Sequence, residues 1–263
     1  MTTTTPALPL PSRLLDSRVL PPTLFGTTST ARMHGKPATA GDAPIVLGEP
    51  GGCPPQGSLV HVVLDQSPSV TSDGGTDPLS RRHAEAALAI RHVAAACRCR
   101  RDRVALAPFD AESAGAVAPQ PLTRRGLRTL DHGLQQLADT WGMSSRLGPA
   151  LDRVEAEKTD SGVLRAVVVF SDFLLTDPNP SSVLRRLCEL PGYVHAVVLG
   201  AQPPTVLLAD PHVAVTRLTP SSPAGSAARA VFDGLTRFRT HTHDPGSAAH
   251  PHENLGSEGE LIA

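Results

Sequence analysis

Residues 166–170 read Ala-Val-Val-Val-Phe, and this stretch decides the fold. A short, unbroken apolar run of this kind is typical of a strand that is buried on both faces of a parallel sheet. Residues 59–64, Leu-Val-His-Val-Val-Leu, form a second run of the same type, with His61 predicted to be a core residue. Further strands are predicted over residues 104–109, 194–199, 213–218 and, as a short edge strand that tolerates two prolines, 116–122.

Helical patterns alternate with these strands. Asp77-Pro78 has the form of a helix N-cap followed by proline at the first helical position, and apolar residues three and four apart continue from there to Cys97. Similar stripes predict helices over residues 127–141, from 147 onward, over 180–190 and over 227–238. This alternation predicts an α/β fold, with a doubly wound, mostly parallel central sheet flanked by helices.

The 263-residue chain divides into three parts. Residues 1–55 are rich in Pro, Thr and Gly and are predicted to be mostly disordered, although the apolar island at residues 45–47 could add an edge strand or dock on the domain. Residues 56–239 carry the predicted domain. Residues 240–263 hold four histidines among Pro, Gly and Ser; we expect a disordered, solvated tail, the alternative being a soft divalent metal bound by its two His-x-His pairs.

The charge balance excludes broad classes of partner. The chain has 24 Lys and Arg residues against 25 Asp and Glu residues, a formal net charge of −1. This gives no basis for non-specific binding to nucleic acid or to an anionic membrane. No apolar stretch is long enough to span a membrane, and residues 1–20 lack the cationic and apolar blocks of a signal peptide, so we expect a cytoplasmic protein.

The four cysteines indicate no metal or disulfide framework. Cys97 and Cys99 are two residues apart on a predicted helix, where their side chains would point to different faces and could neither pair nor chelate together. Cys53 and Cys188 are isolated in the sequence.

Ligands of doubly wound sheets bind beyond the carboxyl ends of the strands, at the point where the strand order reverses. Polar side chains follow both buried strands at this edge. The strand at residues 59–64 is followed by Asp65-Gln66-Ser67-Pro68-Ser69, and the strand at residues 166–170 is followed by Ser171-Asp172-Phe173. A third polar stretch, Ser144-Ser145, precedes the helix that starts near residue 147. Carboxylates and hydroxyls without a cation among them suit Mg²⁺, with Mn²⁺ also possible, better than zinc.

These three loops resemble the metal-ion-dependent adhesion site of von Willebrand factor type A (vWA) domains. Asp65-x-Ser67-x-Ser69 resembles the first metal loop of that family, the stretch from Ser145 to Leu151 resembles the second, and Asp172 the third. The resemblance implies that Ser67, Ser69 and Ser145 would bind Mg²⁺ directly. Asp65 and Asp172 would act through bound water, and an Asp or Glu of a protein partner would take the open position.

Three positions depart from the family pattern. Pro68 stands where the family often has glycine, and Phe173 stands where glycine is usual, placing a bulky ring at the expected rim. Serine replaces threonine in the second loop, where Ser144 could compete with Ser145. We expect Phe173 and Trp141 to supply apolar contacts around the partner's carboxylate.

The sequence therefore predicts a non-catalytic, magnesium-dependent protein-interaction module of the bacterial intracellular type. Such members of the family often work beside AAA-type ATPases, which the resemblance implies as one kind of partner. No nucleophile elbow, P-loop or dinucleotide fingerprint follows a strand. The alternatives are a metal-dependent hydrolase that uses the same Asp and Ser rim, and a metal-free vWA-like scaffold in which Asp65, Ser67 and Ser69 only cap a turn.

Overall fold

The structure is a computed structural model, and it describes residues 45–239 except 78–80, 98, 110–113 and 141. Its centre is a six-stranded sheet with the order β3-β2-β1-β4-β5-β6, in which only β3 is antiparallel to its neighbour. The strands are β1 (Ser58–Leu64), β2 (Arg103–Pro108), β3 (Val117–Pro121), β4 (Leu164–Ser171), β5 (Tyr193–Leu199) and β6 (Val213–Leu218). The doubly wound, mostly parallel α/β fold predicted from the sequence is confirmed.

The strand order reverses between β1 and β4. From β1 the chain continues to β2 and β3 on one side, and β4, β5 and β6 follow on the other. All seven residues of β1 are buried, as are the last six residues of β4, because helices cover both faces of the sheet. The carboxyl ends of β1 and β4 therefore form the switch point at which such folds bind ligands.

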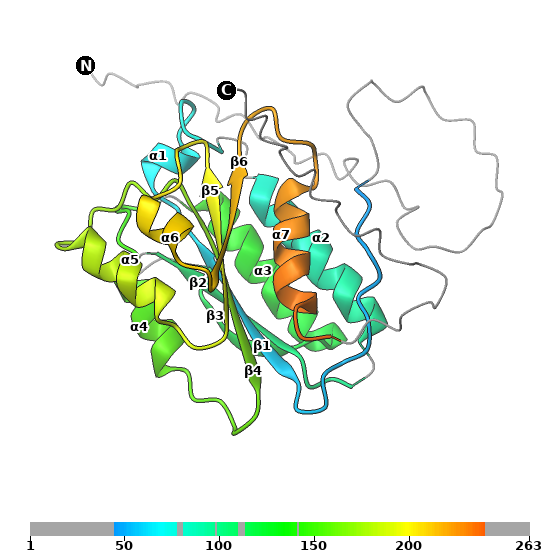
Figure 1. Cartoon of the computed structure of the whole chain (residues 1–263). Helices are drawn as coiled ribbons and strands as arrows, with labels where there is room; N and C mark the ends of the chain where they lie inside the picture. Colours follow the sequence, from blue (N-terminus) through cyan, green and yellow to red (C-terminus); the bar gives the residue numbers. More distant parts are fainter. Residues whose placement is uncertain (1–44, 78–80, 98, 110–113, 141, 240–263) are drawn as a thin grey trace, which may run out of the picture. The chain divides into compact units, whose positions relative to one another are not determined.

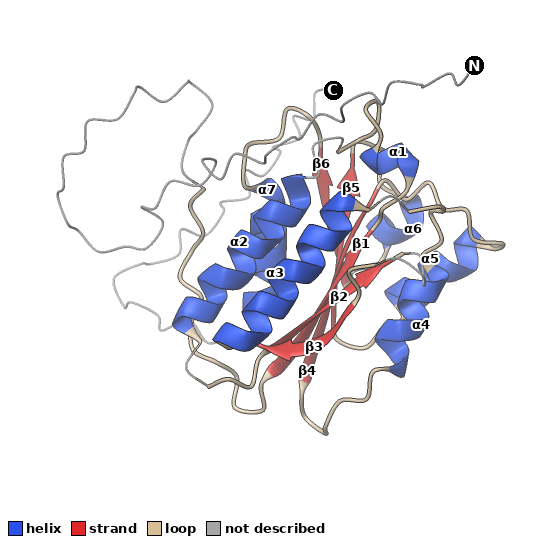
Figure 2. Cartoon of the chain, turned by 180° about the vertical axis from the view of Figure 1, so that it is seen from behind, coloured by secondary structure: helices blue, strands red, loops and turns tan. Residues whose placement is uncertain are grey.

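Three long helices cover one face of the sheet and three shorter ones cover the other (Figure 2). The first group is α2 (Arg81–Ala96), α3 (Arg124–Asp139) and α7 (Ser226–Thr236). The second group is α4 (Gly148–Ala156), α5 (Pro180–Cys188) and α6 (Thr205–Ala209). A single turn, α1 (Pro68–Thr71), follows β1 at the carboxyl edge of the sheet (Figure 1).

Local capping signals place several helix ends. The side chain of Asn179 accepts a hydrogen bond of 3.0 Å from the backbone N–H of Ser182, and Pro180 occupies the first position of α5, as the sequence predicts. The predicted start of α2 falls partly on residues 78–80, which lie outside the described residues. The predicted end of α2 was wrong, because the helix stops at Ala96 and Cys97 and Cys99 lie in the turn that follows.

His61 lies inside the core, as predicted. It is 3% exposed on β1 and its Nε2 has no hydrogen-bond partner within the described part of the chain. Burial, with a smaller contribution from the charge of Arg165, lowers the pKa of His61 to about 4. The imidazole is therefore neutral and acts as a packing group at neutral pH.

Residues 45–53 run along α2 and α7 without forming a helix or a regular strand (Figure 1). Ile45 lies against Gly225, whose positive φ and close neighbour leave no room for a Cβ atom. His92 on α2 contacts the carbonyl oxygen of Gly48 at 2.9 Å, and Arg239 donates a hydrogen bond of 3.2 Å to that of Gly51. The apolar island thus docks on the helices; residues 1–44 and 240–263 lie outside the described residues, so their disorder remains a prediction.

Candidate metal centre

The three predicted loops meet at the carboxyl edge of β1 and β4. Asp65 directly follows β1, Asp172 directly follows β4, and the second loop precedes α4. The backbone N–H of Gly142 donates a hydrogen bond of 2.8 Å to the carbonyl oxygen of Gln66, which joins the first loop to the second. The hydroxyl of Ser171 donates a hydrogen bond of 2.6 Å to Oδ2 of Asp65, which joins the first loop to the third.

Asp65 is fully buried and held at both carboxylate oxygens. Its Oδ1 accepts a hydrogen bond of 2.8 Å from the backbone N–H of Ser67, an Asx turn, while its Oδ2 accepts from Ser171. Burial raises the pKa of Asp65, and the nearby charge of Asp172 acts in the same direction, while the hydrogen bonds from Ser171 and Ser67 oppose it. Burial therefore disfavours the charged form of Asp65, and the charge of Asp172 is near enough to add to this effect.

Ser67 and Ser69 present their hydroxyls to each other, with an Oγ–Oγ distance of 3.0 Å. Ser67 is the N-cap residue of α1, yet its side chain makes no capping hydrogen bond. Turn capping therefore accounts for Asp65 but not for this hydroxyl pair. Adjacent oxygen ligands of octahedral Mg²⁺ lie about 3 Å apart, so the pair has the separation of two such ligands. Ser67 is buried and Ser69 is exposed, so the cluster reaches solvent at Ser69.

Asp172 leaves one buried oxygen without a partner. Its Oδ1 accepts a hydrogen bond of 3.0 Å from the backbone N–H of Leu174. Its Oδ2 is buried and makes no hydrogen bond to any described residue. Because a buried carboxylate oxygen without a partner is costly, this atom calls for a cation or an ordered water. The donor chemistry of the cluster fits a hard divalent cation.

Residues 176 and 177 hold the second metal loop in place. The backbone N–H of Ser145 donates to the hydroxyl of Thr176, and the backbone N–H of Thr176 donates to the carbonyl oxygen of Ser145, each at 3.2 Å. The buried carboxylate of Asp177 accepts hydrogen bonds of 2.9 Å from the backbone N–H groups of Leu147 and Gly148, capping α4 from outside its own segment. In this loop Ser145 is buried and Ser144 is half-buried.

A buried cation, Arg82, contacts the first loop, whereas Arg146 in the second loop is exposed. The guanidinium of Arg82 donates a hydrogen bond of 2.8 Å to the carbonyl oxygen of Asp65 and pairs with Asp77 at 2.5 Å. The side chain of Arg82 is 1% exposed, so both of these contacts are shielded from solvent. Arg82 therefore braces the backbone of the first loop from the α2 side.

The sequence placed Ser171 at this edge without a role, and it did not connect Thr176, Asp177 or Arg82 with the site. Ser171 stands beside Asp172 in the sequence, and its position at the end of β4 was the one available signal. Asp177 accepts hydrogen bonds from residues 30 and 29 positions earlier in the chain. Arg82 donates a hydrogen bond to a residue 17 positions earlier. No spacing rule within one helix or strand connects residues so far apart.

The expected rim position of Phe173 was wrong. Phe173 is 7% exposed and packs in the core between the sheet and α4 and α5, together with Leu147 and Leu184. Its φ of 57° is left-handed, which explains why glycine is usual at this position in the family that the loops resemble. The exposed apolar side chains near the loops are instead Met143, 92% exposed, and Leu174, 63% exposed. Trp141 lies outside the described residues.

No family model and no curated protein matches this sequence. Among solved structures, the chain is similar to the pilus adhesin SpaC from Lactobacillus rhamnosus GG, with a TM-score of 0.52 and 11% identity over 71% of this chain and 31% of that one. This similarity shows a shared fold, the doubly wound, mostly parallel α/β sheet described above.

Two further similar structures carry lower scores. One is a von Willebrand factor type A protein from Catenulispora acidiphila, with a TM-score of 0.45 and 11% identity over 68% of this chain and 43% of that one. The other is the manganese-loaded TRAP protein from Plasmodium vivax, with a TM-score of 0.41 and 12% identity over 62% and 69%. Within the described residues, no helix has the length and apolar character needed to cross a membrane.

Proposed function

We propose that this domain is a non-catalytic protein-interaction module that binds an acidic side chain of a partner protein through a divalent cation. The observation that carries the proposal is the juxtaposition of two buried carboxylates, Asp65 and Asp172, beside the hydroxyl pair of Ser67 and Ser69. Without a cation, this arrangement places like charges together in the protein interior, which costs stability. An arrangement of that kind is typical of a functional site.

Ser67, Ser69 and Ser145 would hold Mg²⁺ or Mn²⁺ directly, and Asp65 and Asp172 would hold it through water. The cation would supply an electrophilic position that attracts an anionic oxygen. Ser171 fixes the orientation of Asp65, while Thr176 and Asp177 fix the loop that carries Ser145. These contacts pre-organise the oxygen donors before a ligand arrives.

An Asp or Glu of the partner is the ligand that the charge balance favours. The two carboxylates of the site and a divalent cation together carry no net charge, so a further carboxylate is not repelled and gains an ionic contact in a partly buried place. Met143 and Leu174 are exposed beside the loops and would pack around that carboxylate. An AAA-type ATPase is one class of partner that the sequence resemblance suggests.

A hydrolase is the weaker alternative. Hydrolysis at this rim would need a general base close to the cation. The described histidine that contacts the first loop is His83, which is buried and lies 3.0 Å from the side-chain nitrogen of Gln66. Because His83 is buried and contacts Gln66, it is a poor candidate for a general base that must reach a substrate.

The proposal is tested by capture of a partner from the native host with the full chain as bait. Proteins retained in Mg²⁺, released by EDTA and restored by Mg²⁺ are the expected partners. Ser67→Ala and Asp172→Asn should mimic EDTA. Ser161→Ala and Asp160→Asn are matched controls, because both residues are exposed in the loop before β4, at the opposite edge of the sheet. Equal capture by wild type in Mg²⁺, wild type in EDTA and Asp172→Asn would refute the proposal.

A further inference from the structure

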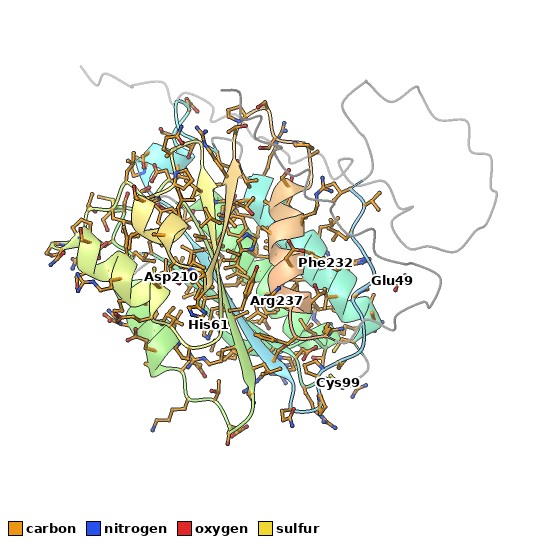
Figure 3. All side chains as sticks on the ribbon, in the orientation of Figure 1. Glu49, His61, Cys99, Asp210, Phe232 and Arg237 are labelled. Atoms are coloured by element: carbon orange, nitrogen blue, oxygen red, sulfur yellow. The ribbon has the colours of Figure 1, made fainter. Side chains whose placement is uncertain are left out.

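Three cysteines converge at the amino edge of the sheet, opposite the candidate magnesium site. Cys53 precedes β1, while Cys97 and Cys99 lie in the turn that follows α2. The Sγ atom of Cys97 lies 3.7 Å from that of Cys53 and 3.7 Å from that of Cys99. Figure 3 labels Cys99 at the lower side of the domain, whereas α1 and the carboxyl edge lie at the upper side.

The expectation that Cys97 and Cys99 could not chelate together was wrong. It assumed that the helix continues through both residues. Because α2 ends at Ala96, the chain turns after it and brings both thiols to the same side. The left-handed φ of 57° at Arg100 continues this turn toward β2. Cys53 approaches from a segment 44 residues earlier, which no cysteine spacing could reveal.

A carboxylate completes the group. Oδ2 of Asp102 lies 3.8 Å from the Sγ atom of Cys97, and one ligand atom from each of the four residues lies within 4.8 Å of the others. Oδ1 of Asp102 accepts hydrogen bonds of 3.0 Å from both the backbone N–H and the hydroxyl of Ser58. Asp102 is therefore held firmly at the starts of β1 and β2.

The sulfur separations are those of a tetrahedral thiolate site. Zinc–sulfur bonds of about 2.3 Å place neighbouring sulfurs of a tetrahedron about 3.8 Å apart. The observed separations of 3.7 Å agree with that value. A disulfide would join only two of the three sulfurs, at about 2.05 Å. Three thiols and a carboxylate around one point are better explained by a shared cation than by one covalent bond.

A guanidinium and a backbone N–H group contact the cluster and partly offset its negative charge. The backbone N–H of Arg101 donates a hydrogen bond of 3.3 Å to the Sγ atom of Cys99. The guanidinium of Arg239 is buried and pairs with Oδ2 of Asp102. Three thiolates, one carboxylate and Zn²⁺ carry a net charge of −2, which the guanidinium of Arg239 partly offsets, and such outer contacts orient the ligands.

We propose that Cys53, Cys97, Cys99 and Asp102 form a zinc site with a structural role. Thiolate ligands select zinc over magnesium, so this site and the carboxyl-edge site would take different metals. Four protein ligands leave no open position for a substrate, which is the pattern of structural zinc. The site would link residues 45–57 to the end of α2 and the start of β2, and through Arg239 to the segment after α7. This inference does not depend on the proposed function.

The test uses the full chain, purified under reducing conditions and titrated with Co²⁺ as a spectroscopic substitute for zinc. We expect one tightly bound ion per chain, with thiolate-to-cobalt charge-transfer absorption that zinc abolishes. Cys53→Ser and Cys99→Ser should each weaken the affinity by at least about tenfold, since losing a ligand costs no less than losing an outer contact. Cys188→Ser is the matched control, because Cys188 is equally half-buried but lies on α5, on the other face of the sheet.

The thiolate charge-transfer absorption distinguishes the cysteine site from other sites that could bind Co²⁺. Metal bound by the tail histidines or by the carboxyl-edge loops would give no thiolate charge transfer, and Ser67→Ala should leave the thiolate band unchanged. The proposal is overturned by absence of the band in the reduced full chain or by a band that survives in Cys99→Ser. It is also overturned if mass mapping of the protein isolated without reductant finds a Cys53–Cys97 disulfide and no zinc.

Discussion

The hydroxyl of Ser171 donates a 2.6 Å hydrogen bond to Asp65 across 106 residues of chain. Ser171 is the last residue of β4, and Asp65 is the first residue after β1. This contact therefore joins the ends of β1 and β4, the two strands between which the strand order reverses. Because the backbone N–H of Ser67 holds the other carboxylate oxygen, the side chain of Asp65 is fixed from both sides. The candidate metal site is built around this fixed carboxylate.

Asp65→Asn should separate metal binding from folding. Mg²⁺ at ten times its Kd should stabilise the wild-type fold by about 1.4 kcal/mol, because it binds only the folded state. For a domain of this size, that is a rise of about 3 to 6 °C in Tm. Asn can still accept from Ser67 and contact Ser171 but carries no charge, so the metal-free variant should be at least as stable as wild type and should lose the Mg²⁺ shift.

Asp65→Ala provides the contrast, because the hydroxyl hydrogen of Ser171 and the backbone N–H of Ser67 would both be left buried without their acceptor. We expect the metal-free Ala variant to lose about 1 to 3 kcal/mol of unfolding free energy. Thermal melts in EDTA and in Mg²⁺ measure both effects. A Tm shift of wild-type size in Asp65→Asn would contradict direct involvement of this carboxylate.

Ser171→Ala should weaken metal binding without removing any proposed ligand. Loss of the hydrogen bond to Asp65 frees that carboxylate to rotate, and losing such an outer contact typically costs about 10- to 100-fold in metal affinity. Calorimetric titration with Mn²⁺ measures the affinity directly. Ser161→Ala, at the opposite edge of the sheet, should bind as wild type does. If both variants bind equally well, Ser171 has only a packing role.

Asp177→Ala should loosen the second metal loop. The backbone N–H groups of Leu147 and Gly148 would lose their acceptor, which costs about 0.5 to 2 kcal/mol of unfolding free energy, as for other helix caps. Because the same loop carries Ser145, we also expect a weaker Mg²⁺ shift in Tm. Asp160→Asn serves as the control. An unchanged Mg²⁺ shift in a destabilised Asp177→Ala would show that α4 is capped independently of the metal site.

Acid should destabilise the fold through His61. The unfolded imidazole binds a proton near its ordinary pKa of 6.5, whereas the folded one does so at about 4. Between these values the unfolded state holds more protons, so stability falls as the pH falls. Between pH 7 and a pH well below 4, the resulting loss of unfolding free energy is roughly 3 kcal/mol. Burial lowers the pKa of His195 as well, so this residue also makes the fold less stable in acid.

Urea unfolding at a series of pH values from 7 to 4 measures this loss. His61→Gln should flatten the curve, because the side chain no longer titrates, whereas His132→Gln, at an exposed position on α3, should not. A pH dependence that is identical in wild type and His61→Gln would refute the assignment.

Residues 45–56, which precede or begin the predicted domain of residues 56–239, should contribute to the stability of the fold. A fragment of residues 45–240 keeps the contacts of Ile45, Gly48 and Gly51 with α7, α2 and Arg239, together with Cys53. A fragment of residues 57–240 loses all of them, so we expect it to melt at a lower temperature in the same buffer. Equal melting temperatures would show that the docked segment contributes nothing to stability.

The sequence by itself determined the fold class and the first residues of the site. The apolar runs at 59–64 and 166–170 specify strands buried on both faces, and the helical stripes between strands require a mostly parallel sheet. The polar residues that follow these two strands, Asp65 and Asp172, could then be placed at one edge. All of these features are local, because periodicity and capping depend on residues close together in the chain.

Only the tertiary structure decided which side chains meet. The partners of Asp65 and of the second loop, Ser171 and Asp177, come from segments that no local pattern connects to them. Phe173 has a left-handed backbone and packs in the core beside α4, not at the rim. Cys53 reached Cys97 and Cys99 because α2 stops at Ala96 and residues 45–53 dock beside it. Such contacts depend on where elements end and how they pack, and hydrophobic periodicity carries little information about either.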